Sequence, residues 1–163
     1  MVLLVQYTLI FASVLALVAL GGCFSEHSGV INIGLEGIMV MGALGGALAM
    51  KFLPASTPGI VLFILIVLAS VVVGMVFSLL LGFAAIHFNA DQTLVGTALN
   101  LMGTAAAVVI VRAINVAENP DNVSSTVVYR QAKQVFLVKI GDFEFNWFML
   151  IIVLAIIASH IVL

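Results

Sequence analysis

Long stretches without a charged residue are the feature that most constrains this chain. Of its twelve Lys, Arg, Asp and Glu residues, eight lie between Arg112 and Glu144. None lies in four other ranges, which are Met1–Ser25, Gly37–Met50, Phe52–Ala90 and Phe145–Leu163. Charged residues make up 7% of the chain and hydrophobic residues 64%, whereas a soluble domain carries about 25% charged residues. Such a chain cannot cover itself with a surface that water wets, so we predict a membrane protein.

The uncharged stretches are long enough to be membrane spans. A helix needs about 20 mostly apolar residues to cross the hydrocarbon core. We therefore predict an all-α, polytopic bundle in which residues 1–163 form a single transmembrane domain with about five spans. The expected spans are Leu3–Cys23, Val30–Met50, Gly59–Phe88, Thr93–Val111 and Asn146–Leu163, and a polar connector covers Arg112–Phe145. The second and fourth spans are expected to start irregularly, because polar residues and glycines cluster there.

Several other classes of protein are excluded by charge and residue counts. A net charge of −2 gives no basic surface for nucleic acid. Cys23 is the single cysteine, which excludes internal disulfides and cysteine metal clusters. The sequence has no Walker-type phosphate loop and no His-Glu-x-x-His motif. We therefore expect no enzyme activity, no catalytic residue, no cofactor and no metal in this chain.

Small residues recur at helical spacing and predict close helix packing. In the third predicted span they return every four residues, and shorter series occur in the second and fourth. Small residues let helix backbones approach each other, and van der Waals contact then drives association in lipid. The residues expected to break or pack helices are Gly34, Gly37, Gly42, Gly46, Gly74, Ser78, Gly82 and Gly96.

Polar side chains mark the starts of the second and fourth spans. Asn32 and Glu36 lie four residues apart, so they share a face wherever one helix includes both. Gln92 and Asn100 share a face with Gly96 by the same spacing. A carboxylate at membrane depth usually serves a function, and two interrupted spans with polar starts indicate a transport pathway. We predict that Asn32, Glu36, Gln92 and Asn100 line a substrate pathway.

A structural explanation stays open for two of these residues. Glu36 could cap a broken helix by accepting backbone N–H bonds, and Asn100 could bridge two helices. Either arrangement satisfies the rule that polar groups inside a membrane find partners in the protein.

The strings SEHSGVINIGLEGIMVMGA and ADQTLVGTALNL, beginning at Ser25 and Ala90, carry a family resemblance. They are similar to the membrane subunit of bacterial nucleoside ABC importers, within the wider permease family for ribose-type sugars and branched-chain amino acids. The resemblance covers essentially the whole chain, although His27 stands where related sequences commonly carry arginine. Family permeases are considerably longer, and the basic loop that docks on the ATPase is missing. We therefore expect an N-terminal portion of a permease.

The resemblance also implies a function and a set of partners. It implies a multi-pass subunit in the bacterial cytoplasmic membrane that translocates nucleosides, or related ribosides and sugars. A second permease subunit, a cytoplasmic ABC ATPase and a substrate-binding lipoprotein would complete the importer. The ATPase would hydrolyse ATP. The alternatives are a self-contained small membrane protein, either a proton-coupled carrier or a structural subunit, and a non-functional permease fragment.

Two indications of membrane orientation disagree. The connector holds four of the five Lys and Arg residues, which the positive-inside rule places in the cytoplasm. It also holds four acidic residues, and the resemblance implies that the helix after it leads to the cytoplasmic docking loop. We therefore expect the amino terminus and the connector to lie outside.

Overall fold

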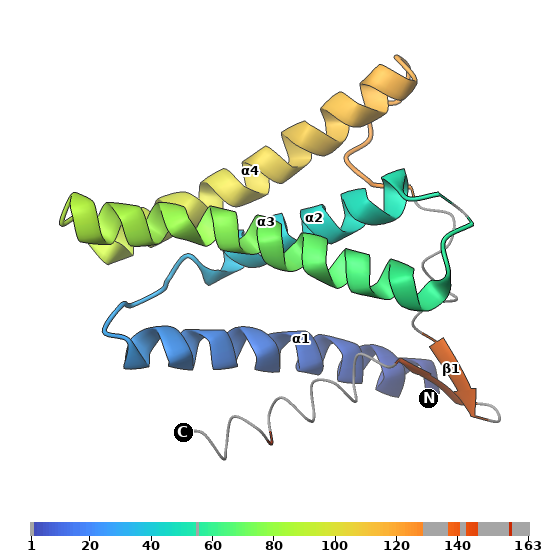
Figure 1. Cartoon of the computed structure of the whole chain (residues 1–163), viewed down its shortest axis with the longest axis horizontal. Coiled ribbons are helices and arrows are strands. Elements are labelled where there is room, and N and C mark those ends of the chain that lie inside the picture. Colours follow the sequence, from blue (N-terminus) through green and yellow to red (C-terminus); the bar gives the residue numbers. More distant parts are fainter. Residues whose placement is uncertain (1, 55, 129–136, 141–142, 147–156, 158–163) are drawn as a thin grey trace. The chain divides into compact units, whose positions relative to one another are not determined.

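A computed structural model describes residues 2–54, 56–128, 137–140, 143–146 and 157 of the chain. Its elements are α1 (Val2–His27), α2 (Leu35–Phe52), α3 (Gly59–His87), α4 (Gln92–Glu118), β1 (Leu137–Ile140) and β2 (Phe143–Asn146), shown in Figure 1. Among the described residues, four helices are long and apolar enough to cross a membrane. The predicted all-α membrane class is therefore confirmed, with four described spans against the five expected.

The chain divides into two compact units, of which the first holds both ends of the sequence. It comprises Met1–Val30 and Lys133–Leu163, and contains α1 and a short hairpin. Strands β1 and β2 pair antiparallel, with Leu137 opposite Asn146. Except for Asn146, this hairpin lies in the range expected to be a polar connector. The fifth predicted span lies outside the described residues except for Asn146 and Ile157, so it stays a prediction.

The second unit, Ile31–Ala132, is built around α2, which packs against both α3 and α4. Glycines on α2 bring α3 close: a Cβ on Gly42 would lie 3.2 Å from the Ser70 carbonyl oxygen. A Cβ on Gly45 would lie 2.7 Å from a methyl of Val73, and one on Gly46 would collide with the Ser70 hydroxyl. The seam between α2 and α3 therefore rests on backbone approach at small residues, as in other membrane bundles.

The turn between α3 and α4 starts the fourth span in a regular way. Asn89 adopts a left-handed backbone with φ of 48°, a conformation that Asn tolerates better than most residues. Asp91 is the N-cap of α4, and its carboxylate accepts from the N–H groups of Thr93 at 2.8 Å and Leu94 at 3.3 Å. Asp at an N-cap satisfies donors that the helix itself cannot pair. The marked interruption among the described helices is therefore the start of α2.

Helix α4 continues past Arg112, where the sequence predicted the end of the span. It reaches Glu118, and its C-cap Asn119 is extended, with φ of −147° and ψ of 111°. Pro120 follows Asn119, and a residue before proline disfavours the helical backbone. One charge did not stop the helix; the proline did. The Arg112 side chain is exposed on α4, and its Nε donates to the Val123 carbonyl at 3.1 Å.

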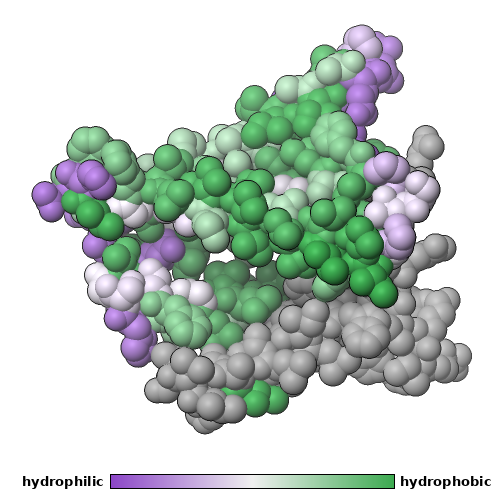
Figure 2. Space-filling model, viewed as in Figure 1, coloured by the Kyte–Doolittle hydropathy of each residue, from purple (hydrophilic) through white to green (hydrophobic). Residues whose placement is uncertain are grey.

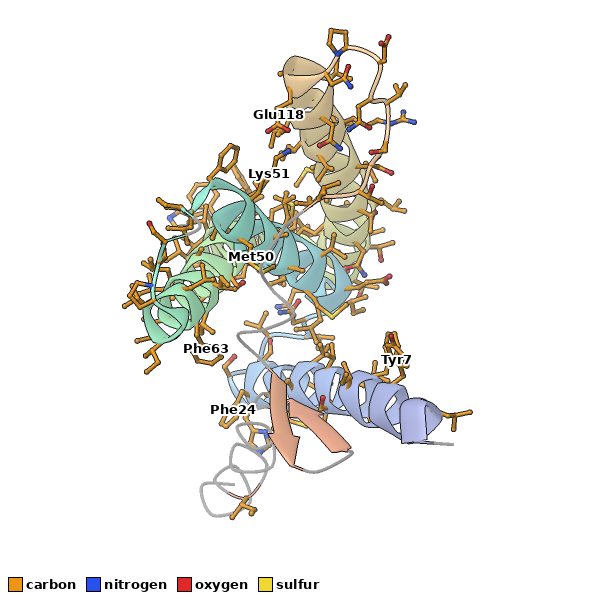
Figure 3. The ribbon with its side chains drawn as sticks, turned by 90° about the vertical axis from the view of Figure 1, so that its right-hand side faces the viewer. Tyr7, Phe24, Met50, Lys51, Phe63 and Glu118 are labelled. Carbon is orange, nitrogen blue, oxygen red and sulfur yellow. The ribbon has the colours of Figure 1, made fainter. Side chains whose placement is uncertain are left out.

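Helices α2 and α4 run in the same direction, because the start of α2 contacts the first half of α4 and the ends of the two helices contact each other. Near the helix starts, Gly37 bonds to Asn100. At the far end, the Lys51 ammonium lies 2.9 Å from the Glu118 carboxylate and 3.2 Å from Asn115 Oδ1; Figure 3 shows Lys51 and Glu118 reaching toward each other. The polar starts of the second and fourth spans therefore lie on one side of the unit.

Asn115 also fastens the chain that follows α4. It is 2% exposed, and its Nδ2 donates to the carbonyls of Ser124 at 2.9 Å and Thr126 at 3.0 Å. The segment between those residues is thus held beside the ends of α2 and α4. In Figure 2 hydrophilic residues gather at the turn between α3 and α4 and at the far end of α4, while the surface of α3 between them is hydrophobic. This pattern fits helices that cross lipid and end in water.

A cysteine at Ser125 tests the expected external position of the connector. With Cys23 replaced by serine, we expect Ser125→Cys to react in intact cells with a membrane-impermeant maleimide. Ser125 is exposed, so burial does not hinder the reaction. Ser56→Cys, in the turn after α2, reports the same side of the membrane, and Ser28→Cys, before α2, reports the opposite side. Protection of Ser125 and Ser56 with labelling of Ser28 would reverse the orientation.

Candidate functional site

The candidate site is the interrupted backbone that leads into α2. Gly29 has a φ of 82°, a conformation that glycine adopts without strain, and the chain stays non-helical from there until Leu35. The N-cap of α2 is Gly34, which offers no side-chain cap. The first N–H groups of any helix have no partner inside it. At membrane depth these donors need partners from elsewhere in the protein.

Asn100 of α4 is a partner for one of those donors and for one carbonyl that precedes the helix. Its Oδ1 accepts from the Gly37 N–H at 2.7 Å, and its Nδ2 donates to the Ile33 carbonyl at 2.9 Å. One amide side chain thus pairs a donor in the first turn of α2 with an acceptor just before it. Interhelical hydrogen bonds of this kind contribute about 0.6–2 kcal/mol each in membranes. The structural explanation offered for Asn100 from the sequence, a bridge between two helices, is what the structure contains.

Gln92 acts in the same way two turns earlier on α4. Its Oε1 accepts from the Ile31 N–H at 2.8 Å. Because Gln92 and Asn100 lie on one face of α4, they contact successive parts of the interrupted segment. The two amides together hold residues 31–37 along the start of α4.

Glycines on both helices allow this close approach. A Cβ on Gly37 would lie 2.9 Å from the Asn100 Cα and would collide with the Leu99 carbonyl. A Cβ on Gly96 would lie 2.9 Å from the Gly34 nitrogen, and one on Gly103 would lie 2.8 Å from the Gly37 Cα. All of these contacts involve backbone atoms, which cannot move aside as a flexible side chain can. The helix crossing therefore needs glycine on both sides.

The other two predicted pathway residues have unused hydrogen-bonding groups. Within the part of the chain that the structure describes, Asn32 Oδ1 is buried and has no hydrogen-bond partner. Glu36 is exposed in the first turn of α2, where the helix dipole favours a negative charge. No hydrogen bond joins its carboxylate to another described residue, so the capping bonds considered for Glu36 are not present there. The pathway role of all four residues stays a prediction.

The chemistry of this site is that of amides and one carboxylate. Lys51 and Arg112, the basic residues of α2 and α4, lie toward the other ends of those helices. The described residues contain no group of three or more His, Cys, Asp or Glu side chains able to hold a metal ion. The arrangement can exchange hydrogen bonds with a neutral, polar solute.

The small residues predicted from sequence have different surroundings. Gly42, Gly46 and Gly74 lie in the seam between α2 and α3. A Cβ on Gly82 would meet no described atom within 4 Å, and the Ser78 hydroxyl donates to the Met75 carbonyl of its own helix at 2.8 Å. Packing roles for these last two residues stay predictions.

Sequence reasoning missed two close-contact glycines and the polar cluster at the far end. Gly45 faces Val73, and Gly103 faces Gly37. Gly103 follows Gly96 by seven residues, a helical repeat that could have identified it. Lys51 and Asn115 lie 64 residues apart in sequence, and nothing local connects them.

Comparison with known proteins supplies the family context. A protein-family model described as "Branched-chain amino acid transport system / permease component" matches residues 4–163 of this chain. The guanosine ABC transporter permease protein NupQ of Bacillus subtilis is 45% identical over 116 residues, which cover 69% of this chain and 35% of that protein. The nucleoside ABC transporter permease protein NupC of Lactococcus lactis is 34% identical over 110 residues, covering 68% of this chain and 34% of that protein.

A third relative carries a sugar name. The putative glucose ABC transporter permease protein TsgC13 of Haloferax volcanii is 35% identical over 101 residues, covering 62% of this chain and 29% of that protein. The matched segments thus span about a third of each of these relatives. No solved structure matches the chain.

Adding one methyl group at Gly37 tests the close approach of α2 and α4. We expect Gly37→Ala to lower the thermal unfolding temperature in detergent micelles, because overpacking against backbone costs about 1–3 kcal/mol. The matched control is Gly82→Ala, where the added Cβ meets no described atom and helix propensity favours alanine by about 1 kcal/mol. Equal stability of the two variants, followed by circular dichroism, would contradict the contact.

Proposed function

The chain belongs to the permease family of branched-chain amino acid transport systems, and we propose that it is a membrane subunit of a bacterial ABC importer for nucleosides. Its four described apolar helices and the family match over residues 4–163 make it a multi-pass membrane protein. The transported substrate, the partner subunits and the transport cycle are all proposed, because the matched segments cover about a third of the length of the curated relatives.

The proposed cargo is chosen from the names of the relatives. At 45% and 34% identity, the two permeases described above are named for guanosine and for nucleosides. The relative named for glucose is 35% identical over a shorter segment. Nucleosides are therefore the proposed cargo, and related ribosides or sugars are the neighbouring class.

The energy source belongs to other subunits. This chain has no phosphate-binding loop in its sequence, so a cytoplasmic ATPase would bind and hydrolyse ATP. A substrate-binding lipoprotein would deliver the nucleoside, and a second permease subunit would complete the passage through the cytoplasmic membrane. This division of work leaves the present chain to provide a pathway and to move when the ATPases do.

The interrupted start of α2 is where we place the pathway. Asn32 and Glu36 have hydrogen-bonding groups not paired within the described residues, and Gln92 and Asn100 hold the backbone beside them. These groups can make passing contacts with ribose hydroxyls or base edges. A pathway must also release its cargo, so few and weak contacts suit it better than tight binding. The proton-coupled carrier and the structural subunit are not favoured by the comparisons.

Uptake of radiolabelled nucleosides tests the function and the role of Glu36. Deletion of the gene from its source bacterium is expected to lower nucleoside uptake, and its restoration is expected to recover it. Unchanged nucleoside uptake in the deletion strain, with a loss of sugar uptake, would contradict the proposed cargo.

In the complete permease, we expect Glu36→Gln to lower uptake several-fold, because one acceptor oxygen and the charge are lost at the start of α2. Glu26→Gln is the matched control, since Glu26 is exposed near the end of α1. Normal uptake by Glu36→Gln at normal subunit levels would remove Glu36 from the pathway.

A further inference from the structure

Helix α3 covers one side of the pair that α2 and α4 form. Phe77 and Leu81 of α3 make a buried cluster with Leu99 of α4, and Ile38 of α2 packs against that cluster. On α2, the residue that faces α4 is Gly37, because its backbone lies against Leu99. These contacts identify which side of α2 and which side of α4 lie toward α3.

Glu36 lies on the side of α2 that points away from α3. Successive residues of an α-helix are about 100° apart around its axis. Glu36 and Ile38 therefore lie on opposite sides of Gly37, and Ile38 is the one that packs against the cluster with α3. Glu36 is exposed, and the contact between Gly37 and Leu99 places it beside the first half of α4.

Two threonines of α4 lie on the corresponding side of that helix. Gly96 faces the start of α2, and Leu99 belongs to the cluster with α3. Around the axis of α4, Leu99 lies about 60° from Gly96 in one direction, whereas Thr97 and Thr104 lie about 100° and 80° from it in the other. Both threonines are exposed. Glu36, Thr97 and Thr104 thus share the side of the α2–α4 pair that points away from α3, which we call the free flank.

Glu36 indicates that the free flank does not face lipid. Threonine hydroxyls that bond to their own helix can lie against hydrocarbon, so the threonines alone do not decide this. A carboxylate within a membrane span, however, faces the interior of a bundle or a water-filled cavity. The surface of α3 between its ends is hydrophobic (Figure 2), which suits contact with lipid. The free flank is therefore the side of this unit suited to a passage.

The exposed polar groups of the free flank accept hydrogen bonds and have no proton left to donate. Thr97 Oγ1 donates to the Thr93 carbonyl at 2.8 Å, and Thr104 Oγ1 donates to the Asn100 carbonyl at 2.9 Å. A hydroxyl has one proton and two lone pairs, so each threonine still offers its oxygen as an acceptor. A carboxylate also accepts only. The free flank is thus complementary to a neutral solute that carries hydroxyl donors.

We propose that Thr97 and Thr104, together with Glu36, accept hydrogen bonds from the sugar hydroxyls of a nucleoside as it passes along the free flank. The two threonines then distinguish cargo by its sugar rather than by its base. Their bonds to their own helix hold the two oxygens in place while cargo contacts are exchanged. This role rests on the proposed importer function, because it assigns part of the cargo to particular side chains.

Thiol labelling tests the position of the free flank without any cargo. In a cysteine-free complete permease held in lipid nanodiscs, we expect Thr97→Cys and Thr104→Cys to react with a water-soluble methanethiosulfonate. The thiolate is the reacting form, and it forms in water rather than in hydrocarbon. Met102→Cys is the matched control, since Met102 is 46% exposed on the Leu99 side of α4, and we expect it to react at least about tenfold more slowly. Equal rates at the three positions would overturn the proposal.

Uptake of two labelled nucleosides tests the role of the hydroxyls. We expect Thr97→Val combined with Thr104→Val in the complete permease to lower the maximal uptake rate of guanosine by about threefold or more. The rate for 2′,3′-dideoxyguanosine, which lacks two hydroxyl donors, should change far less. Serine at both positions keeps the acceptors and should keep both rates. Ser78→Ala is the control, because it removes a hydroxyl that bonds to its own helix on α3.

The outcomes separate this role from a structural one. Equal losses of guanosine and dideoxyguanosine uptake in the double valine variant, or no loss of either, would overturn the proposal. A loss of guanosine uptake in the double serine variant would do the same. Absence of guanosine uptake by the parent protein would instead reject the proposed function, while the labelling result stands.

Discussion

The structure of the second unit depends on one constraint, which is that backbone groups inside a membrane must be paired within the protein. A continuous helix meets this constraint by itself, but α2 does not begin as one. Donors and carbonyls at its start need partners from outside the helix. Asn100 of α4 pairs the Gly37 N–H and the Ile33 carbonyl, and Gln92 pairs the Ile31 N–H before the helix. The position of α4 beside α2 follows from that need.

Glycine makes the pairing possible, because the side chain of Asn100 is short. Its amide reaches the α2 backbone only where Gly34, Gly37, Gly96 and Gly103 let the two helices approach. The glycines of α2 that face α3 allow the same close approach between those two helices. At the far end, Lys51 contacts Asn115 and Glu118, so α2 and α4 are joined by polar contacts at both ends.

The sequence was informative where a pattern is local. Uncharged stretches predicted the helices. Gln92 and Asn100, which were predicted with Asn32 and Glu36 to line a substrate pathway, lie where α4 meets the start of α2. The end of α4 was misplaced at Arg112, because a long side chain can reach outward from a helix while the proline after Asn119 ends it. Gly45 and Asn115 went unnoticed, because Val73 and Lys51, which they contact, lie on other helices and no spacing rule links them.

By itself, the sequence determined that this chain lives in a membrane, which segments can cross it, and which polar residues cannot remain unpaired there. Those properties follow from hydropathy and from the number of residues that a bilayer requires. Only the tertiary structure decided which of these polar residues bind backbone groups and which do not. Asn100 and Gln92 hold backbone, while Asn32 is left with a buried oxygen and Glu36 with an exposed carboxylate. That division depends on distances between helices more than 60 residues apart in the chain, which no local pattern contains.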